Sequence, residues 1–227
     1  MMKREKTTEE KKIVSFFNDL YQINGESEKS LGWSKNKQHI RFSQLLRFIN
    51  EDSFSVLDIG CGFGDFYSYC LNSTKKTIDY WGIDLMPDFI DIAKKNHPEI
   101  KDRFSCGNYF YDNYLSTWDW IVGSGVFNLN LFEDELKMYG YIEKSIKKAF
   151  EHSKRGISFD FLSSKVDYKG DNKCFFSDPE RILSMAYSLS RNLILNNSAM
   201  PFEFCLTLWK DDSFSVESTV FNTYTDK

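Results

Sequence analysis

Residues 56–66 read Val-Leu-Asp-Ile-Gly-Cys-Gly-Phe-Gly-Asp-Phe, and this stretch decides how the rest of the chain is interpreted. An apolar run over residues 54–59 ends in three glycines at alternate positions, Gly60, Gly62 and Gly64. A short apolar run that stops at glycines is typical of a buried strand. The residues that follow are apolar at helical spacing. The stretch therefore predicts a strand, a glycine turn and a helix, an arrangement that binds nucleotides at the edge of an α/β sheet.

The details of the turn exclude two common nucleotide sites. A dinucleotide fingerprint, Gly-x-Gly-x-x-Gly/Ala, needs a small residue where this chain has Asp65. A phosphate-binding P-loop needs Gly-Lys-Ser/Thr after its glycines, and that sequence is absent here. Asp58, inside the end of the strand, would repel a phosphate group. The same carboxylate would attract a ligand that carries positive charge.

The pattern Asp-x-Gly-x-Gly-x-Gly closely resembles motif I of the class I S-adenosylmethionine-dependent methyltransferases. The resemblance implies S-adenosylmethionine as the cofactor and S-adenosylhomocysteine as the product. The ligand is a sulfonium with an α-amino group, which gives an acid beside the turn an electrostatic role. The residues implied in cofactor binding are Asp58, Gly60, Cys61, Gly62 and Gly64. The alternative is a glycine-rich turn that binds no ligand.

Composition sets limits on the class of protein. The 227 residues suffice for one domain with a full core, and 41% hydrophobic and 27% charged residues are ordinary for a globular chain. A net charge of −4 argues against a nucleic-acid partner. Five cysteines without a Cys-x-x-Cys pair suggest neither disulfides nor a metal site. Without a long apolar run or a signal-peptide core, we expect no membrane partner and a cytoplasmic monomer or homodimer.

A second acidic residue lies where a ribose would bind. Residues 77–83 predict the second strand, and Asp84 ends it. One carboxylate can accept hydrogen bonds from both ribose hydroxyls, and class I methyltransferases use an acid at this place in that way. The resemblance also implies that Leu85 and Met86 flank the adenine. The pairing of the glycine motif with Asp84 is more specific than either feature alone.

The third and fourth strands are expected over residues 104–106 and 118–122. After the third, the resemblance implies an adenine contact from Asn108 and ring stacking by Tyr109 or Phe110, although either ring could instead belong to the core. After the fourth, we expect Ser124 to contact the cofactor. Phe127 and Asn128 are candidates for acceptor contact, with a loop-forming role as the alternative for Asn128. The Asn/Asp-Pro-Pro-Tyr/Phe signature of amino-group nucleic-acid methyltransferases is absent here.

The N-terminal region predicts two helices, with apolar faces that begin at Ile13 and at Phe42. The polar segment between them contains Trp33, which is a candidate to pack on the cofactor or the acceptor. Arg41 or Gln38 is a candidate to hold a carboxylate. The alternative is a solvated helix start that the tryptophan anchors. Among the three histidines, only His39 lies in this presumed lid, so it is the one candidate base.

The fifth strand, residues 157–162, contains Asp160 between two phenylalanines. A strand buried on both faces rarely carries a carboxylate unless the group is paired or functional. Asp160 is therefore a candidate general base or acceptor contact, with pairing to a nearby donor as the alternative. The long polar loop that follows contains Tyr168, a candidate to close over an acceptor and to take part in catalysis.

Together these patterns predict an α/β fold with a Rossmann-like, mostly parallel, seven-stranded sheet. We expect an antiparallel last strand, helices on both faces and between the first six strands, and an N-terminal helical lid. Gly156 is expected to end the helix before the fifth strand, and residues 192–196 and 202–209 to form a closing hairpin. The expected division is a lid over residues 1–50, a core over 51–210 and a tail over 211–227.

The predicted function is methyl transfer from S-adenosylmethionine to oxygen or nitrogen of a small-molecule acceptor. Methylation of a protein or RNA is the alternative within the same enzyme class. A protein that binds S-adenosylmethionine without turnover is the alternative outside it, because the acceptor side has no diagnostic motif.

Overall fold

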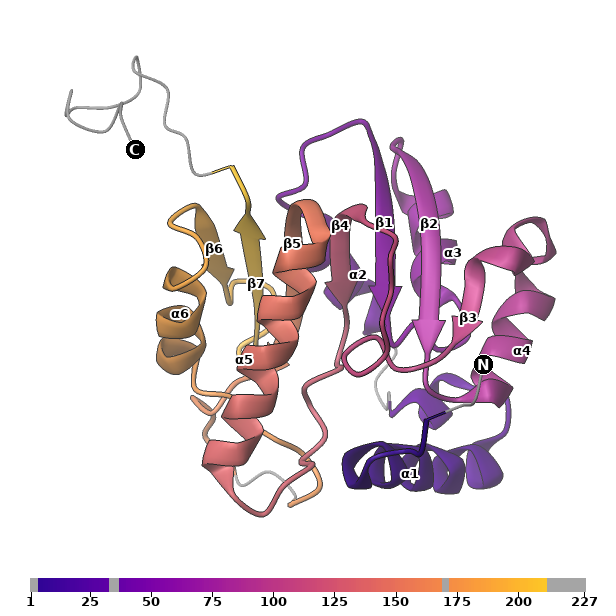
Figure 1. Cartoon of the computed structure of the whole chain (residues 1–227), viewed down its shortest axis with the longest axis horizontal. Helices are drawn as coiled ribbons and strands as arrows, with labels where there is room; N and C mark the ends of the chain where they lie inside the picture. The colour runs from indigo at the N-terminus through magenta and orange to yellow at the C-terminus, as the bar shows by residue number, and fades with distance from the viewer. Residues whose placement is uncertain (1–3, 33–36, 169–171, 212–227) are drawn as a thin grey trace.

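The computed structural model describes residues 4–32, 37–168 and 172–211, which form a seven-stranded sheet between two layers of helices (Figure 1). The strand order is β3-β2-β1-β4-β5-β7-β6. All neighbouring strands are parallel except that β7 is antiparallel to both β5 and β6. The predicted Rossmann-like class, with an antiparallel last strand, is confirmed.

The strands lie close to their predicted positions. Their bounds are β1 Ser53–Ile59, β2 Thr77–Asp84, β3 Phe104–Cys106, β4 Trp118–Gly123, β5 Ser153–Leu162, β6 Leu193–Asn196 and β7 Glu203–Trp209. The central strands β1 and β4 are nearly continuous apolar runs, as expected where a parallel sheet is covered on both faces. The closing hairpin of β6 and β7 is confirmed.

Three helices cover one face of the sheet: α2 Gln38–Leu46, α3 Asp65–Ser73 and α4 Pro87–Asn96. Their buried side chains form one core cluster with Val56, Tyr80 and Trp120 of the sheet. Two helices, α5 Glu135–His152 and α6 Pro179–Tyr187, cover the other face. Figure 1 shows α5 and α6 in front of the sheet and α2 and α3 behind it. Asp178 caps α6 by accepting from Glu180 N, and Pro179 opens it.

The connection between β3 and β4 contains no helix within the residues described, which corrects the expectation of a helix in every crossover. Residues 107–117 form turns and irregular structure instead. Tyr109 and Phe110 cover this part of the sheet, and Tyr109 stacks on Tyr114 with ring centroids 5.6 Å apart. Aromatic side chains therefore replace the missing helix.

The sequence predicted that Gly156 ends a helix, and this prediction was wrong. Strand β5 already begins at Ser153, and Gly156 pairs with Trp209 of β7. A Cβ atom at this position would lie 2.1 Å from the carbonyl oxygen of Leu208 and 2.6 Å from the Trp120 ring. The glycine is therefore required by close packing inside the sheet and not by a helix terminus.

The carboxyl ends of β1, β2 and β4 meet at one edge of the sheet, and α1, Thr8–Asn24, lies across that edge (Figure 1). Two short 3-10 segments, η1 Glu28–Leu31 and η2 Pro98–Arg103, complete the elements. Among the residues described, no helix is long and apolar enough to span a membrane. The edge beneath α1 is where a doubly wound sheet binds its ligand.

Candidate active site

A cavity of about 320 Å³ lies between α1 and the carboxyl edge of the sheet. Its walls come from α1, α2, the loops after β1 to β5, and α5. Of the residues predicted to bind the cofactor, those that line it are Arg41, Asp58, Gly60, Cys61, Gly62, Asp84, Leu85, Asn108, Tyr109 and Ser124. Motifs far apart in the sequence therefore meet in one cavity, at the place that the fold predicts.

The glycine turn exposes backbone to the cavity. Gly60 and Gly62 have φ values of 72° and 53°, a left-handed conformation that glycine adopts without strain. A Cβ atom on Gly60 would lie 2.8 Å from Val126, and one on Gly62 would lie 2.9 Å from Leu31. The turn therefore fits a ligand that lies directly on the backbone, as the methionine part of S-adenosylmethionine would.

Gly64 and Met86 take structural positions outside the cavity lining. Gly64 precedes α3 with a φ of 84°, and a Cβ atom there would meet His97 at 2.6 Å. Met86 is buried in a cluster with Phe63 and Phe89. Gly64 therefore allows His97 to pack closely, and the Met86 side chain packs beneath the site, while the Met86 backbone N–H donates to Asp84.

Asp84 is held in place by the backbone around it. Its Oδ2 accepts from Gly62 N at 2.9 Å, and its Oδ1 accepts from Met86 N at 2.9 Å. Burial raises the pKa of the Asp84 carboxyl, and these two N–H groups act in the opposite direction. Asp84 lines the cavity, and each carboxylate oxygen can accept a further hydrogen bond. The geometry suits a carboxylate that accepts two further hydrogen bonds from a ribose.

Asp58 is a buried acid at the end of β1, only 3% exposed. The Tyr80 hydroxyl donates to its Oδ2 at 2.7 Å. The pKa of Asp58 is raised to about 8, chiefly by burial and in part by the negative charges of Asp84 and Asp65, while the Tyr80 hydrogen bond acts in the opposite direction. A cation bound in the cavity would compensate this carboxylate. The pairing of a buried acid with an open glycine turn therefore suits a cationic ligand.

Cys61 and Asn108 have local structural roles within the cavity wall. Burial raises the pKa of the Cys61 thiol well above its usual value, so the thiol stays protonated. The Asn108 side-chain oxygen accepts from Phe110 N at 2.9 Å, and its backbone N–H donates to Asp112. Asn108 therefore shapes the turn that carries Phe110 into the cavity. Tyr109 points to the core, where its hydroxyl lies 3.1 Å from His152 Nδ1.

Asp160 lies behind the cavity and not in its lining. It is 3% exposed, and its two oxygens accept from the Ser124 hydroxyl at 2.5 Å and from Gly125 N at 2.7 Å. Burial raises the pKa of Asp160 to about 6, while the Arg41 charge and the Ser124 hydrogen bond act against that shift. The carboxylate fixes the turn after β4, which is the pairing alternative considered for it.

Arg41 pairs with Glu203 of β7 through two guanidinium nitrogens, and both side chains are largely buried. The pair joins α2 to the last strand beneath the cavity. Breaking one partner of a buried ion pair typically costs about 3–5 kcal/mol because the other charge is left uncompensated. Arg41 therefore lines the cavity as part of an internal ion pair.

Among the other residues predicted to act on the acceptor, some lie at the cavity and others lie away from it. Asn128 lines the cavity, and its Oδ1 accepts from Leu162 N at 3.0 Å. Phe127 is fully buried beneath the wall and stacks on Phe161 with ring centroids 5.3 Å apart. His39 is exposed on α2, and Tyr168 is 52% exposed; neither lines the cavity. Trp33 lies outside the described residues.

Several residues that form the far wall of the cavity were not identified from the sequence as site residues. They are apolar or aromatic and come from α1, the β4–α5 loop, α5, the end of β5 and the loop after it: Ile13, Phe16, Phe17, Leu129, Leu131, Tyr141, Leu162 and Cys174. Phe110, a candidate from the sequence for stacking on the adenine, lines the same wall. The apolar face of α1 was visible as helical spacing in the sequence. Nothing in that spacing indicates which surface the face covers.

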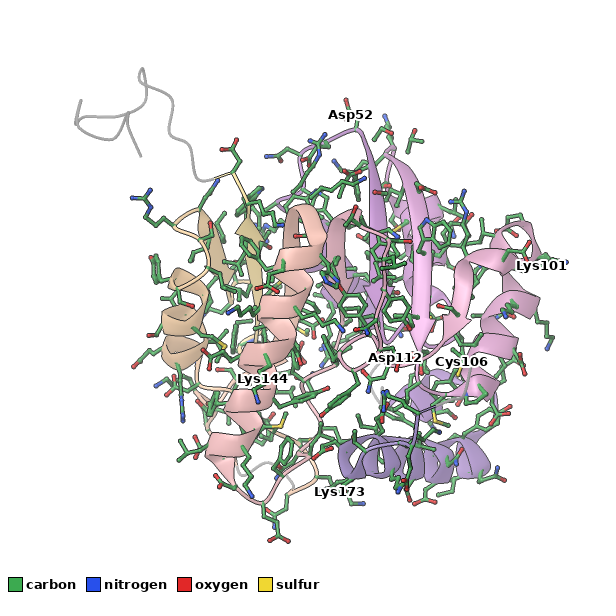
Figure 2. The ribbon with its side chains drawn as sticks, viewed as in Figure 1. Asp52, Lys101, Cys106, Asp112, Lys144 and Lys173 are labelled. Carbon is green, nitrogen blue, oxygen red and sulfur yellow. The ribbon has the colours of Figure 1, made fainter. Side chains whose placement is uncertain are left out.

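An ion-pair network joins α1 to the β3–β4 loop. Glu10 is 2% exposed and receives two hydrogen bonds from the Arg4 guanidinium, each 2.6 Å long. Arg4 Nε also donates to Asp112 at 2.7 Å. Figure 2 labels Asp112 between the end of the sheet and α1. The Asn108 side chain also interacts with the Glu10 carboxylate. This group, Arg4, Glu10, Asn108 and Asp112, is called the α1 latch below.

Comparisons with known proteins were made for sequence and structure. No protein-family model matches the chain. The Mycobacterium tuberculosis protein named "Putative methyltransferase Rv1506c" is 27% identical over 73% of this chain and 99% of its own length. Magnesium protoporphyrin IX methyltransferase from Synechocystis PCC 6803, solved with bound S-adenosylmethionine, has 11% identity and a TM-score of 0.60. That match covers 92% of this chain and all of the Synechocystis chain.

The chain has the class I methyltransferase fold. The resemblance stated from motif I is thereby confirmed, and the predicted enzyme class and cofactor agree with these comparisons. The small RNA methyltransferase HEN1 is also similar in structure, with 14% identity and a TM-score of 0.57 over 79% of this chain and 26% of that chain. Class I methyltransferase folds therefore serve acceptors of different kinds, and the fold alone does not identify the acceptor.

Proposed function

We propose that this protein transfers a methyl group from S-adenosylmethionine to a small-molecule acceptor. The observation that carries the proposal is the cavity itself. One end combines the glycine turn with Asp58 and Asp84, and α1, which lies across this edge of the sheet (Figure 1), contributes Ile13, Phe16 and Phe17 to the lining. The cofactor supplies a methyl group that is already activated for transfer. The protein's contribution is then alignment of the acceptor and exclusion of water.

Each residue at the cofactor end would contact a different part of S-adenosylmethionine. Asp84 would accept the ribose hydroxyls, and the backbone of Gly60 and Gly62 would carry the methionine part. Asp58 would compensate the positive charge. Leu85 lines the cavity next to Asp84, where it would contact the adenine. Each role follows from an orientation described above and from the chemistry of that side chain.

The roof over the cavity favours a small molecule as the acceptor. Phe17 and Tyr21 of α1 pack edge-on against Phe89, with ring centroids 6.1 and 5.9 Å apart. The Lys12 ammonium of α1 donates to the carbonyl oxygen of Leu131, a residue that lines the cavity. The α1 latch holds the start of the same helix. A protein or RNA acceptor would have to displace this helix, whereas a small molecule would fit beneath it.

Label transfer from S-adenosylmethionine with a radioactive methyl group tests this assignment. The protein is incubated with a cell extract that has been separated into small molecules, RNA and protein. We expect labelled product in the small-molecule fraction, at a rate that depends on added protein. Label confined to RNA or protein would contradict the small-molecule assignment. No labelled product in any fraction, despite cofactor binding, would support a binding protein without turnover.

Removing the latch arginine, Arg4→Ala, is expected to loosen α1 without unfolding the sheet. Glu10 would keep its buried position with one fewer partner, and the tie to Asp112 would be lost. A partly exposed ion pair contributes up to about 1 kcal/mol, so amide hydrogens of α1 should exchange faster by up to about 5-fold. Hydrogen exchange with mass spectrometry measures this.

Lys11→Ala is the matched control, because Lys11 is on the same helix and pairs with Glu5 in an exposed ion pair. Its α1 exchange should equal that of the wild type. Equal α1 protection in Arg4→Ala and wild type would show that the latch does not hold the helix.

The proposed cytoplasmic location, the monomeric or homodimeric state and the three-part division of the chain stay predictions.

A further inference from the structure

The polar side chains at the acceptor end of the cavity are already engaged within the protein. The Ser124 hydroxyl donates to Asp160, and Asn128 Oδ1 accepts from Leu162 N. Arg41 is paired with Glu203. The Tyr141 hydroxyl interacts with the side chain of Ser145 on the same helix. A polar acceptor would have to break such contacts, and a buried polar group that loses its partner costs free energy.

The remaining surface at this end is apolar and largely aromatic. Phe110 lies edge-on to Tyr141, with ring centroids 5.9 Å apart, and stacks on Phe127 at 5.7 Å. Phe127 is fully buried and stacks on Phe161, so the wall has a rigid backing. Phe16 and its neighbour Ile13 supply the opposite wall from α1. A cavity lined by several aromatic rings favours a flat, apolar guest.

The carboxylates near the cavity are engaged or belong to the cofactor end. Asp160 accepts hydrogen bonds from Ser124 and Gly125, His39 is exposed and outside the described lining, and Asp58 and Asp84 belong to the cofactor end. Among the described residues of the lining, this arrangement favours an acceptor that loses its proton to solvent before it reacts.

We propose that the acceptor is an aromatic small molecule whose ring carries a hydroxyl or thiol acidic enough to ionise in water. This inference rests on the proposed function. The ionised oxygen or sulfur uses a lone pair to form the bond to the methyl carbon. The bond between that carbon and the sulfonium sulfur breaks, and its electron pair stays on sulfur. The acceptor proton has already passed to water, so charge and atoms balance without a protein base.

Probe binding tests the recognition part without depending on turnover. Calorimetric titrations with 4-nitrophenol, phenol and glucose are run in the presence of saturating S-adenosylhomocysteine. We expect binding of both aromatic probes and none of glucose. Phe16→Ala and Phe110→Ala should each weaken 4-nitrophenol binding about 10-fold, because each removes one apolar wall. Tyr187→Ala, which changes an exposed aromatic residue on α6, should leave it unchanged.

Tyr141→Phe removes the hydroxyl of this wall residue and keeps its aromatic ring in place. If the ring and not the hydroxyl recognises the acceptor, the variant should bind 4-nitrophenol as the wild type does. Loss of binding in Tyr141→Phe, or binding of glucose with no binding of the phenols, would overturn the proposal. Methyl transfer should be faster to 4-nitrophenol than to phenol at neutral pH, because more of the former is ionised. Equal rates would contradict proton loss to solvent.

Titration of the same protein with S-adenosylhomocysteine tests the proposed methyltransferase function separately from the proposed aromatic acceptor. If S-adenosylhomocysteine binds and the aromatic probes do not, the acceptor assignment fails and the proposed function stands. If S-adenosylhomocysteine does not bind to the folded protein, the proposed function fails, and the acceptor assignment fails with it.

Discussion

Asp84→Ala is expected to weaken binding of S-adenosylmethionine and S-adenosylhomocysteine 10-fold or more, about 1.4 kcal/mol or more. The substitution removes the acceptor for the ribose hydroxyls. It also leaves Gly62 N and Met86 N without the carboxylate oxygens that hold the glycine turn. Both effects act on the cofactor end of the cavity. Calorimetric titration of the variant beside the wild type measures the change.

Two further variants separate ribose contact from general loss of stability. Asp79→Ala changes the same residue type on the same strand, but Asp79 is exposed and pairs with Arg103 outside the cavity, so its affinity should be that of the wild type. Asp84→Asn retains one carbonyl oxygen and should bind with intermediate affinity. Wild-type affinity in Asp84→Ala would show that Asp84 does not contact the ligand.

Asp58→Asn is expected to change stability and binding in opposite directions. A neutral amide can still accept the Tyr80 hydrogen bond, and it avoids the cost of a buried charge. At pH 8 the variant should be more stable than the wild type by roughly 2 kcal/mol, or about 4–8 °C in Tm for a chain of this size. Its affinity for S-adenosylmethionine should fall 10-fold or more, because the cation loses its counter-charge. Thermal unfolding and calorimetry test the two halves.

The pH dependence of this difference has a definite sign. The folded-state pKa of Asp58, about 8, is above its unfolded value of about 3.8, so the folded protein binds the extra proton between these pH values. The wild-type contribution is fully present below about pH 4 and is lost as pH rises through 8. The Tm advantage of Asp58→Asn should therefore grow from near zero at pH 4 to its maximum near pH 8.

Ligand affinity follows the opposite course. A bound cation favours the carboxylate form, so S-adenosylmethionine binding to the wild type should strengthen as pH rises toward 8 and release a proton at pH 7. Calorimetry in two buffers of different ionisation enthalpy counts that proton. No proton release, together with an unchanged affinity in Asp58→Asn, would contradict the proposed charge compensation.

Asp119→Asn is the matched control for these measurements. Asp119 lies on the neighbouring strand β4 and outside the cavity lining. Although burial raises its pKa, the N–H and hydroxyl of Ser55 and nearby positive charges lower it below the usual value. The sign is therefore reversed: the variant should be less stable than the wild type above pH 4. Its cofactor affinity should be unchanged.

The fold could be predicted because its evidence is local in sequence. Each strand is a short apolar run, and glycine or proline lies at several of the boundaries, as Gly60 and Pro87 do. The expected helix between β3 and β4 was wrong because Tyr109, Phe110 and Tyr114 cover the sheet there in place of a helix. Gly156 was misplaced because its reason is a contact with Leu208 and Trp120, which lie far away in sequence.

Within the site, too, features that are local in sequence could be predicted, and contacts between distant segments could not. The cofactor end is built from loops that directly follow β1, β2 and β3, so Asp58, Gly62 and Asp84 could be identified from position alone. The acceptor end joins α1 to α5 and to the loop after β5, and no local pattern predicts that these elements meet. Glu10 illustrates the difficulty: in the sequence it is one of several charged residues near the N-terminus, and only the structure places it under Arg4 against Asn108.

Titration of the wild-type protein with S-adenosylhomocysteine and S-adenosylmethionine tests the central claim most directly. The account predicts one site per chain with micromolar affinity for both ligands, near −8 kcal/mol. Circular dichroism on the same sample establishes that the protein is folded. Absence of binding by folded protein up to millimolar ligand would contradict the methyltransferase assignment and leave the glycine turn without its proposed ligand.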